Sequence, residues 1–255
     1  MLDSHTEQFH LKCHPGELGE YCLLPGDPAR CEKIAKHFER PEFFSSNREY
    51  TIWRGYINGV RVSVCSTGIG GPSAAIAVEE LAACGVKKFI RVGTCGGIDL
   101  SVCPGDVVIA TGAVRQDGTS REYAPLEFPA VSDFKLTTAL VDSAKELALP
   151  YHTGVVQSKD SFYGQHSPKR MPIASELTEK WEAWKRLGVL ASEMEAAAIF
   201  TVCASLGLSA GAVFHVIWNQ ERAACGDFQN EEECHDTERA VRCAVNALKL
   251  LISEK

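Results

Sequence analysis

One arginine of this sequence stands inside an apolar run that leads directly into glycines. We interpret Lys88–Val92 as a buried strand that carries Arg91, and the following Gly93–Ile98 as a glycine-rich turn. A guanidinium in an apolar strand is costly unless an anion meets it. Glycines beyond the strand let backbone N–H groups approach that anion closely. This segment therefore predicts an oxyanion site at the C-terminal end of a sheet.

Two further glycine-bearing turns follow predicted strands and lead into predicted helices. They are Gly26–Arg30, with the sequence GDPAR, and Thr67–Ser73, with the sequence TGIGGPS. The N–H groups and the macrodipole of a helix N-terminus favour an anion, and the guanidinium of Arg30 matches phosphate oxygens. Neither turn has the spacing of a P-loop or of a dinucleotide-binding loop. Turning a corner explains each glycine turn alone, but arginines at two of the three junctions favour an anion site.

The elements that must position these residues alternate between strands and helices. The predicted strands are Tyr21–Leu24, Arg48–Trp53, Val60–Ser66, Lys88–Val92, Asp106–Ala113, Thr153–Gln157, Val189–Ala191 and Gly211–Trp218, and the predicted helices are Ala29–Phe38, Ala74–Cys84, Phe134–Leu147, Glu176–Leu187, Ser192–Leu206 and Glu238–Ser253. This alternation predicts one α/β domain over residues 1–255, with a central mixed sheet flanked by helices on both faces. The long irregular stretches 114–133, 158–175 and 219–236 are candidate functional loops.

The composition limits the functions open to the chain. Its 255 residues carry a net charge of −7, so nucleic-acid binding is disfavoured and an anion site must come from locally gathered arginines. The first residues lack the basic and apolar regions of a signal peptide, and no apolar stretch is long enough for a membrane span, so we expect no membrane association. The 11 cysteines include no C-x-x-C pair, which favours buried thiols in a reducing cytoplasm over a zinc site.

Two other motifs allow more than one interpretation. The sequence SEME at Ser192–Glu195 precedes an apolar run, so Ser192 and Glu195 fit a helix capping box; alternatively, Glu195 accepts hydrogen bonds from a diol. The sequence FYGQH at Phe162–His166 lies in an irregular stretch, where an aromatic ring beside an amide could either read a heterocycle or simply pack. The residues alone leave both alternatives open.

Several long segments, in order along nearly the whole chain, resemble the nucleoside phosphorylase superfamily and, within it, the branch that cleaves uridine. These segments are Pro25–Arg30, Cys65–Ser73, Ala77–Leu81, Ala124–Val131 and Ser192–Glu195. The resemblance implies a phosphorylase/hydrolase-like fold whose central mixed sheet is partly barrel-like.

The resemblance also implies roles for individual residues. The implied sets are Gly26, Arg30, Arg48, Arg91 and Thr94 for phosphate; His10, Glu193, Met194 and Glu195 for ribose; and Phe162 and Gln165 for the base. Arg48 and His10 would act from a neighbouring subunit, where His10 would reach the ribose 5′-hydroxyl, and Glu195 would hold the 2′- and 3′-hydroxyls. Some relatives hold a monovalent cation such as K⁺ at a dimer interface, at positions matching Glu49, Ile69 and Ser73.

The base loop departs from the pattern of the uridine-cleaving branch. That branch carries Gln-x-Arg, with the arginine reading a uracil carbonyl, but here Ser167 stands at the arginine position. The possible substitutes are Lys159, His166, Lys169 and Arg170, with Arg222 as a further candidate for the uracil side. We favour Lys159 and His166, because either can donate a hydrogen bond to a uracil oxygen. Asn219 stands where purine-specific relatives carry an aspartate acid, which disfavours a purine substrate.

These residues predict reversible phosphorolysis of uridine to uracil and α-ribose 1-phosphate in pyrimidine salvage, with 2′-deoxyuridine and thymidine as further candidate substrates. Catalysis would depend on Arg91, Glu195, Lys159 and His166. The resemblance implies no cofactor, inorganic phosphate as co-substrate, a cytoplasmic location, and a homo-oligomer in which a dimer unit is assembled into a hexamer. Loop 223–236 would be a lid that excludes water.

Three other functions compete with this prediction. A nucleosidase of the same superfamily would use water in place of phosphate, and a purine nucleoside phosphorylase would accept a purine. A non-catalytic nucleoside-binding protein on the same fold is the third. The gathered arginines and Glu195 favour the phosphorylase over all three.

Overall fold

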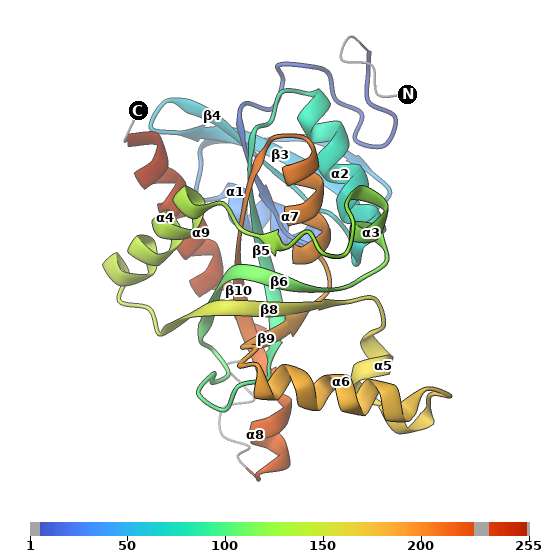
Figure 1. The fold of residues 1–255 in the computed structure, drawn as a ribbon. Coiled ribbons are helices and arrows are strands. Elements are labelled where there is room, and N and C mark those ends of the chain that lie inside the picture. The colour runs from blue at the N-terminus through green and yellow to red at the C-terminus, as the bar shows by residue number, and fades with distance from the viewer. Residues whose placement is uncertain (1–5, 227–234, 254–255) are drawn as a thin grey trace.

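A computed structural model describes residues 6–226 and 235–253 of the chain (Figure 1). Its strands are β1 Tyr21–Leu24, β2 Glu39–Asn47, β3 Tyr50–Ile57, β4 Val60–Cys65, β5 Lys88–Gly97, β6 Val107–Gln116, β7 Ala130–Val131, β8 Tyr151–Lys159, β9 Ala191–Glu193 and β10 Ser209–Asn219. Its helices are α1 Pro28–Ala35, α2 Gly71–Ala83, α3 Thr119–Tyr123, α4 Phe134–Glu146, α5 Phe162–His166, η1 Pro168–Arg170, α6 Ala174–Arg186, α7 Ala196–Ser205, α8 Gln220–Ala224 and α9 Glu238–Ser253.

The described strands form one mixed sheet in the order β10-β6-β8-β9-β5-β1-β4-β3-β2, with β7 attached to β6. Strand β10 also pairs with β5, in parallel, along almost the whole of both strands. This extra pairing closes β5, β10, β6, β8 and β9 into a ring, while β1 to β4 continue as an open sheet. The predicted α/β fold with a partly barrel-like mixed sheet is therefore confirmed.

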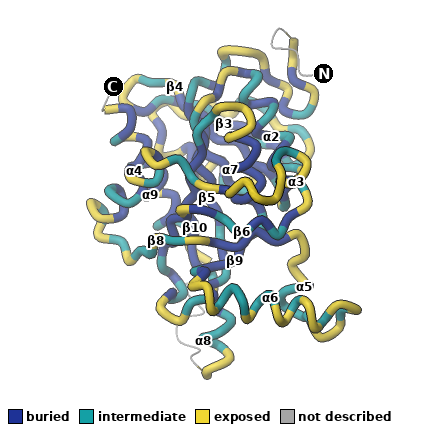
Figure 2. The backbone as a smooth tube through the Cα atoms, in the orientation of Figure 1, coloured by how far each residue is buried: buried dark blue, intermediate teal, exposed yellow. Residues whose placement is uncertain are grey.

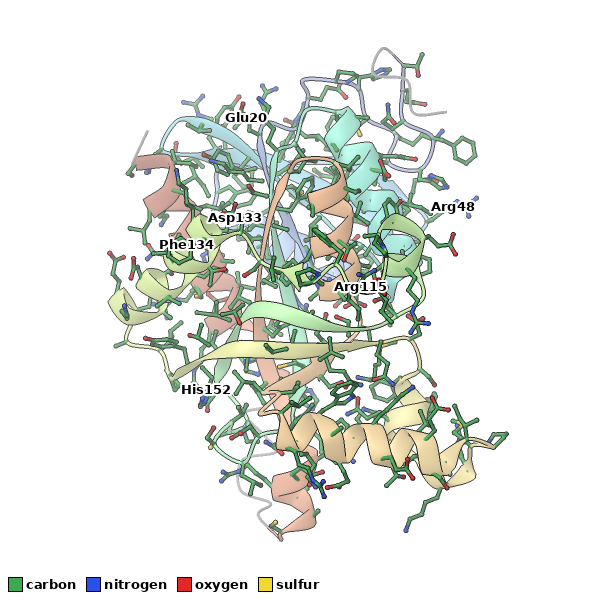
Figure 3. The ribbon with its side chains drawn as sticks, in the orientation of Figure 1. Glu20, Arg48, Arg115, Asp133, Phe134 and His152 are labelled. Atoms are coloured by element: carbon green, nitrogen blue, oxygen red, sulfur yellow. The ribbon has the colours of Figure 1, made fainter. Side chains whose placement is uncertain are left out.

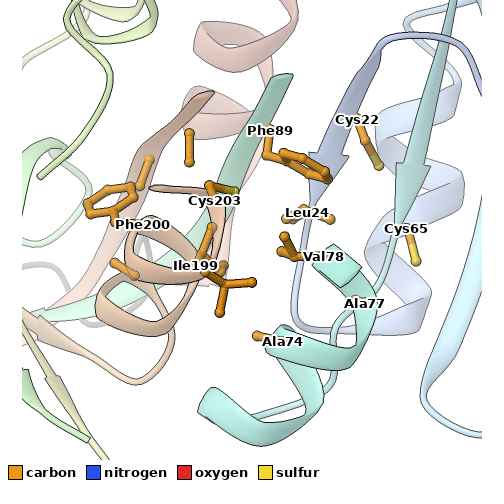
Figure 4. Packing of buried hydrophobic residues seen from close by; sticks show 14 of the residues in the cluster. Cys22, Leu24, Cys65, Ala74, Ala77, Val78, Phe89, Ile199, Phe200 and Cys203 are labelled. Atoms are coloured by element: carbon orange, nitrogen blue, oxygen red, sulfur yellow. The ribbon is translucent and has the colours of Figure 1, made fainter. Parts of the chain in front are cut away.

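Two apolar layers lie on opposite faces of the sheet. On one face α2 and α7 pack through Val78 and Ile199 against Phe89 of β5 (Figure 4). On the other face α1, α4 and α9 pack against Ile90, the next residue of the same strand. Consecutive side chains of a strand point to opposite faces, so an unbroken apolar run is what a strand covered on both sides requires.

The glycine-rich turn predicted after Val92 is wrong, because β5 continues through Gly97 and stays paired with β10. A Cβ on Gly93 would lie 2.6 Å from a ring carbon of Phe214. A Cβ on Gly97 would lie 2.5 Å from Nδ2 of Asn219. The glycines therefore allow the large side chains of β10 to lie across β5 rather than turning the chain.

Strand β2 is absent from the sequence-based prediction. Its sequence, ERPEFFSSN, contains a proline and charged residues, and none of its residues is buried. A proline is tolerated on an edge strand, where its missing N–H costs no ladder hydrogen bond. The three long irregular stretches also contain short elements: α3 and β7 in the first, α5 and η1 in the second, and α8 in the third. Much of the predicted lid at 223–236 lies outside the described residues.

The described cysteines fit the prediction of buried thiols. Eight of the ten are buried and all ten are free; the exceptions to burial are Cys103 and Cys225. Within residues 6–226 and 235–253, no helix combines the length and the apolar character needed to cross a membrane.

Candidate active site

A cavity of about 570 Å³ opens where β1, β4, β5, β8 and β10 end. Ligands of α/β sheets commonly bind at this edge, beyond the carboxyl ends of the strands. The cavity is lined by Gly26, Asp27, Pro28, Arg30, Gly68, Ile69, Arg91, Thr94, Cys95, Gly96, Lys159, Phe162, Gln165, His166, Ser192, Glu193, Met194, Glu195, Ile217 and Trp218. The cavity thus gathers most of the residues predicted for phosphate, ribose and base.

Arg91 forms one wall of the cavity and is only 4% exposed. Its Nη1 donates to the carbonyl of Leu24 at 3.2 Å and to Oγ1 of Thr67 at 3.1 Å. Its Nη2 donates to Oε2 of Glu195 at 2.5 Å. Its Nε–H finds no acceptor among the described residues. A buried guanidinium with an unused donor, fixed by Leu24 at the end of β1 and by Thr67 and Glu195 just beyond β4 and β9, is suited to hold an anion.

Arg30 stands beside Arg91 in the same wall and donates from Nη1 to the carbonyl of Val92 at 3.2 Å. Burial and the neighbouring guanidinium of Arg91 lower the pKa of Arg30. An anion bound between the two guanidinium groups would reduce the electrostatic repulsion between them. Gly26 completes the wall, since a Cβ there would lie 3.2 Å from Nη2 of Arg91.

Glu195 lies between the arginine wall and α2. Its Oε1 accepts a hydrogen bond from the N–H of Gly70 at 2.7 Å, while its Oε2 pairs with Arg91. The capping-box interpretation is wrong, because Ser192 belongs to β9 and α7 begins only at Ala196. A carboxylate has more lone pairs than these two donors use, so Glu195 can also accept from a diol.

Glu193 lines the cavity but serves mainly to hold the start of α7. Its Oε2 accepts from the N–H groups of Glu195 and Ala196, at 2.8 and 2.9 Å, and its Oε1 accepts from the hydroxyl of Ser158. Burial and the neighbouring carboxylate of Glu195 raise the pKa of Glu193 to about 7. Its neighbour Met194 also lines the cavity.

The opposite end of the cavity is organised by a relay of three polar side chains. Nζ of Lys159 donates to Oγ of Ser192 at 2.7 Å, and that hydroxyl donates to Oε1 of Gln165 at 2.6 Å. Lys159 is 5% exposed, and its burial lowers its pKa to about 8, against the opposing effect of nearby Glu193 and Glu195. This end therefore presents an amide and an ammonium whose charge is sensitive to pH near neutrality.

Three rings surround this relay. The ring centroids of Phe162 and His166 lie 4.2 Å apart, and those of His166 and Trp218 lie 5.4 Å apart. Burial and the charge of Lys159 lower the pKa of His166. The sequence analysis did not assign Ser192 or Trp218 to this end. For Trp218, the one feature of the sequence that could have indicated this position is a large aromatic residue at the end of an apolar strand.

Other predicted residues lie away from the cavity walls. His10 and Arg48 do not line it within this chain. Arg222 donates to the carbonyl of Leu100 at 2.7 Å, and Asn219 donates to the carbonyls of Asp99 and Val102 at 2.8 and 2.9 Å. The two remaining substitutes do not line this cavity: Lys169 lines a second cavity beside α6, which shares Lys159 and Gln165 with the first, and Arg170 stacks on Tyr163.

The three residues matched to a cation site lie together at the start of α2. A Cβ on Gly68 would lie 2.9 Å from Cγ of Glu49 and 3.3 Å from Oγ of Ser73. Oγ of Ser73 in turn donates to the carbonyl of Ile69 at 3.3 Å. Among the residues that the structure describes, no cluster of three or more His, Cys, Asp or Glu side chains could hold a metal ion.

The fold and the site together define an α/β protein whose cavity sets two arginines beside a buried carboxylate and has an aromatic-lined space beyond. Comparisons with known proteins agree with this class. The family model described as "Phosphorylase superfamily" matches residues 20–253. The uridine phosphorylase of Treponema pallidum is 52% identical over 247 residues, which are 97% of this chain and 95% of that protein.

Two other relatives show the range of the match. The uridine phosphorylase of Escherichia coli is 44% identical in a match of 255 positions that covers 98% of this chain and 100% of that protein. The guanosine phosphorylase of Halorubrum lacusprofundi is 39% identical in a match of 251 positions that covers 96% of this chain and 100% of that protein. The chain belongs to the phosphorylase superfamily.

Proposed function

We propose that the protein catalyses the reversible phosphorolysis of uridine to uracil and α-ribose 1-phosphate, in pyrimidine salvage. The observation that carries this proposal is that one cavity holds the Arg30–Arg91 pair, the Glu195 carboxylate and the Lys159–Ser192–Gln165 relay. The uridine phosphorylases that match the chain over nearly its full length support the same reaction.

The arginine wall binds inorganic phosphate, the co-substrate, and no other cofactor is required. Phosphate held by Arg30, Arg91, Thr94 and the backbone at Gly26 attacks C1′ of the ribose from the face opposite the base. The C1′–O bond forms as the glycosidic bond breaks, and the electron pair of that bond leaves with uracil. Glu195 fixes the sugar through its hydroxyls. Catalysis is then positioning plus electrostatic stabilisation, with no covalent enzyme intermediate.

The relay end receives the negative charge that develops on the leaving base. Gln165 reads the uracil edge, Phe162 covers its face, and protonated Lys159 donates to a uracil oxygen as charge grows there, with His166 beside it. Buried Lys159 is a strong stabiliser at this position because few waters compete with its hydrogen bond. The same pocket admits 2′-deoxyuridine, which lacks one hydroxyl of uridine, and thymidine, which lacks the same hydroxyl and carries one additional methyl group.

A purine substrate is disfavoured by the position of Asn219. Its Nδ2 donates to two backbone carbonyls of the segment 99–102, and its Oδ1 accepts from the N–H groups of Glu221 and Arg222. An amide held in this way cannot protonate a purine ring. Initial rates with uridine, 2′-deoxyuridine, thymidine and inosine at one phosphate concentration test the assignment. Uridine should be cleaved fastest, and a preference for inosine would contradict it.

The active unit is an oligomer in which Arg48 and His10 complete the site of a neighbouring subunit. Arg48 lies at the β2–β3 turn, at the edge of the molecule in Figure 3, and is not among the residues that line the cavity of its own chain. Exposed apolar side chains support a partner, with Ile69 at the cavity 78% exposed and Phe9 68% exposed. We propose a dimer unit assembled as a hexamer, with K⁺ at Glu49, Ile69 and Ser73, in the cytoplasm.

A further inference from the structure

The N-terminal segment around His10 is held against α2 by one buried carboxylate. Oε1 and Oε2 of Glu80 accept from the backbone N–H of His10 at 3.1 and 3.0 Å, and Oε2 also accepts from the N–H of Leu11 at 2.8 Å. Oε1 in addition lies 2.6 Å from Nδ1 of the His10 ring. Glu80 is only 5% exposed, so water competes little for these bonds. A single side chain thus binds the backbone and the ring of His10 at once.

This contact determines which way the His10 ring presents its nitrogens. A carboxylate oxygen accepts hydrogen bonds and does not donate them, so the geometry assigns the ring proton to Nδ1. Nε2 is then the nitrogen that remains for an outside partner. The ring is also edge-on to Tyr50, with centroids 6.2 Å apart, which limits its rotation. Glu80 therefore sets both the tautomer and the direction of His10.

The same segment is joined to the turn that carries Arg48. Nδ2 of Asn47 donates to the carbonyl of His10 at 2.7 Å. The next residue, Arg48, has a φ of +56°, a conformation that L-residues adopt at a cost and that its surroundings must hold. His10 and Arg48 consequently form one surface, and both are the residues proposed to act on a neighbouring subunit.

We propose that Glu80 is a positioning residue for catalysis in the partner subunit's site, where it aims Nε2 of His10 at the ribose 5′-hydroxyl. This inference rests on the proposed phosphorolysis of uridine and on the position of His10 in it. It adds a residue that contacts neither phosphate, ribose nor base. Glu80 lies 70 positions from His10 in the sequence, so the pairing is visible only in the folded chain.

A substrate comparison separates positioning from simple stabilisation. Glu80→Gln keeps the size of the side chain but replaces one acceptor with an NH₂ group facing three N–H donors. We expect Glu80→Gln to lower kcat/KM for uridine about tenfold and to leave kcat/KM for 5′-deoxyuridine, which lacks the hydroxyl, nearly unchanged. The ratio of the two values does not depend on how much of the variant is folded. Glu79→Gln, the same change one residue away, is the matched control and should leave the ratio as it is.

A double variant tests whether Glu80 acts through His10. Glu80→Gln combined with His10→Ala should lose no more activity on uridine than His10→Ala alone, because both changes remove one contact. Equal losses on the two nucleosides, or additive losses in the double variant, would overturn the inference while leaving the proposed function intact. Absence of phosphorolysis in the unsubstituted protein would overturn both.

Discussion

The two ends of the cavity are built in different ways. At the phosphate end, Arg91 and Glu195 are each tied to a backbone group, the carbonyl of Leu24 and the N–H of Gly70. At the base end, Lys159 and Gln165 are tied to each other only through the hydroxyl of Ser192. In the proposed function, these backbone ties hold the nucleophile in one place, whereas a relay of side chains can readjust around different bases.

Burial follows this division only for the aromatic part of the base end, since Lys159 is itself 5% exposed. Arg91 and Glu195 are each 4% exposed, whereas Phe162 of the base end is 51% exposed. Figure 2 shows exposed and half-buried residues along α5 and α6, in contrast to the buried strands that carry the arginine. The reaction requires a fixed attacking group, and specificity is set where fewer contacts hold the chain. The expected effects of substitution should therefore decrease from the phosphate end to the base end.

The largest effect is expected for Arg91→Ala. This change removes the proposed phosphate ligand and leaves the Glu195 carboxylate buried without its cation. We expect kcat/KM for uridine to fall about 10³-fold, with the KM for phosphate raised. Steady-state kinetics at varied phosphate measure both. Arg115→Ala is the matched control: Arg115 is also buried, but its guanidinium binds carbonyls of the 120–128 segment outside the cavity (Figure 3). An unchanged phosphate KM in Arg91→Ala would contradict its role.

Lys159→Met should have the next largest effect. It preserves the length of the side chain but removes the charge that stabilises the leaving uracil. We expect kcat/KM for uridine to fall about 10²-fold while the KM for phosphate stays the same. A variant that lost phosphate affinity equally would show that the two ends are not separable.

His166→Ala should cost less, about tenfold in kcat/KM for uridine, because it removes one neutral contact to the base. The loss should fall mainly on the KM for uridine. Normal kinetics in this variant would shift the uracil contact to Lys169 or Arg170, although neither of them lines the cavity.

The smallest of these effects is expected in the pH dependence of kcat/KM for uridine, which tests the base end. Burial lowers the pKa of Lys159 to about 8, so its donating, protonated form is present below that pH and is lost above it. We expect kcat/KM for uridine to fall roughly fourfold between pH 7 and pH 8.5. Lys159→Met should lose this limb. A limb that persists in the variant would belong to ionisation of the nucleoside or of another group.

The cavity gathers most of the residues predicted for both ends, but Ser192 and Trp218 at the base end were not predicted. Arg91 lies in an apolar strand whose period and burial can be predicted from local composition. The capping-box interpretation of Ser192 and Glu195 is wrong, and the sequence could not exclude it because a capping box and a ribose carboxylate share one spacing before an apolar run. That spacing could not show that α7 begins only after Glu195.

The parts of the site that the sequence did not predict depend on contacts between residues far apart in the chain. The relay from Lys159 to Ser192 and the clamp from Glu80 to His10 join residues 33 and 70 positions apart. No local pattern marks such pairs. Similarly, the choice between His166 and Lys169 depends on which side of α5 and η1 faces the cavity, and the short helices were not predicted.

The most direct test of the central claim is whether phosphate is the attacking group. Uracil release from uridine should be measured with and without inorganic phosphate, with the sugar product followed by phosphorus NMR. We predict that release requires phosphate and yields one equivalent of α-ribose 1-phosphate for each uracil. Equal rates without phosphate, with free ribose as the product, would contradict the account and show that water is the nucleophile.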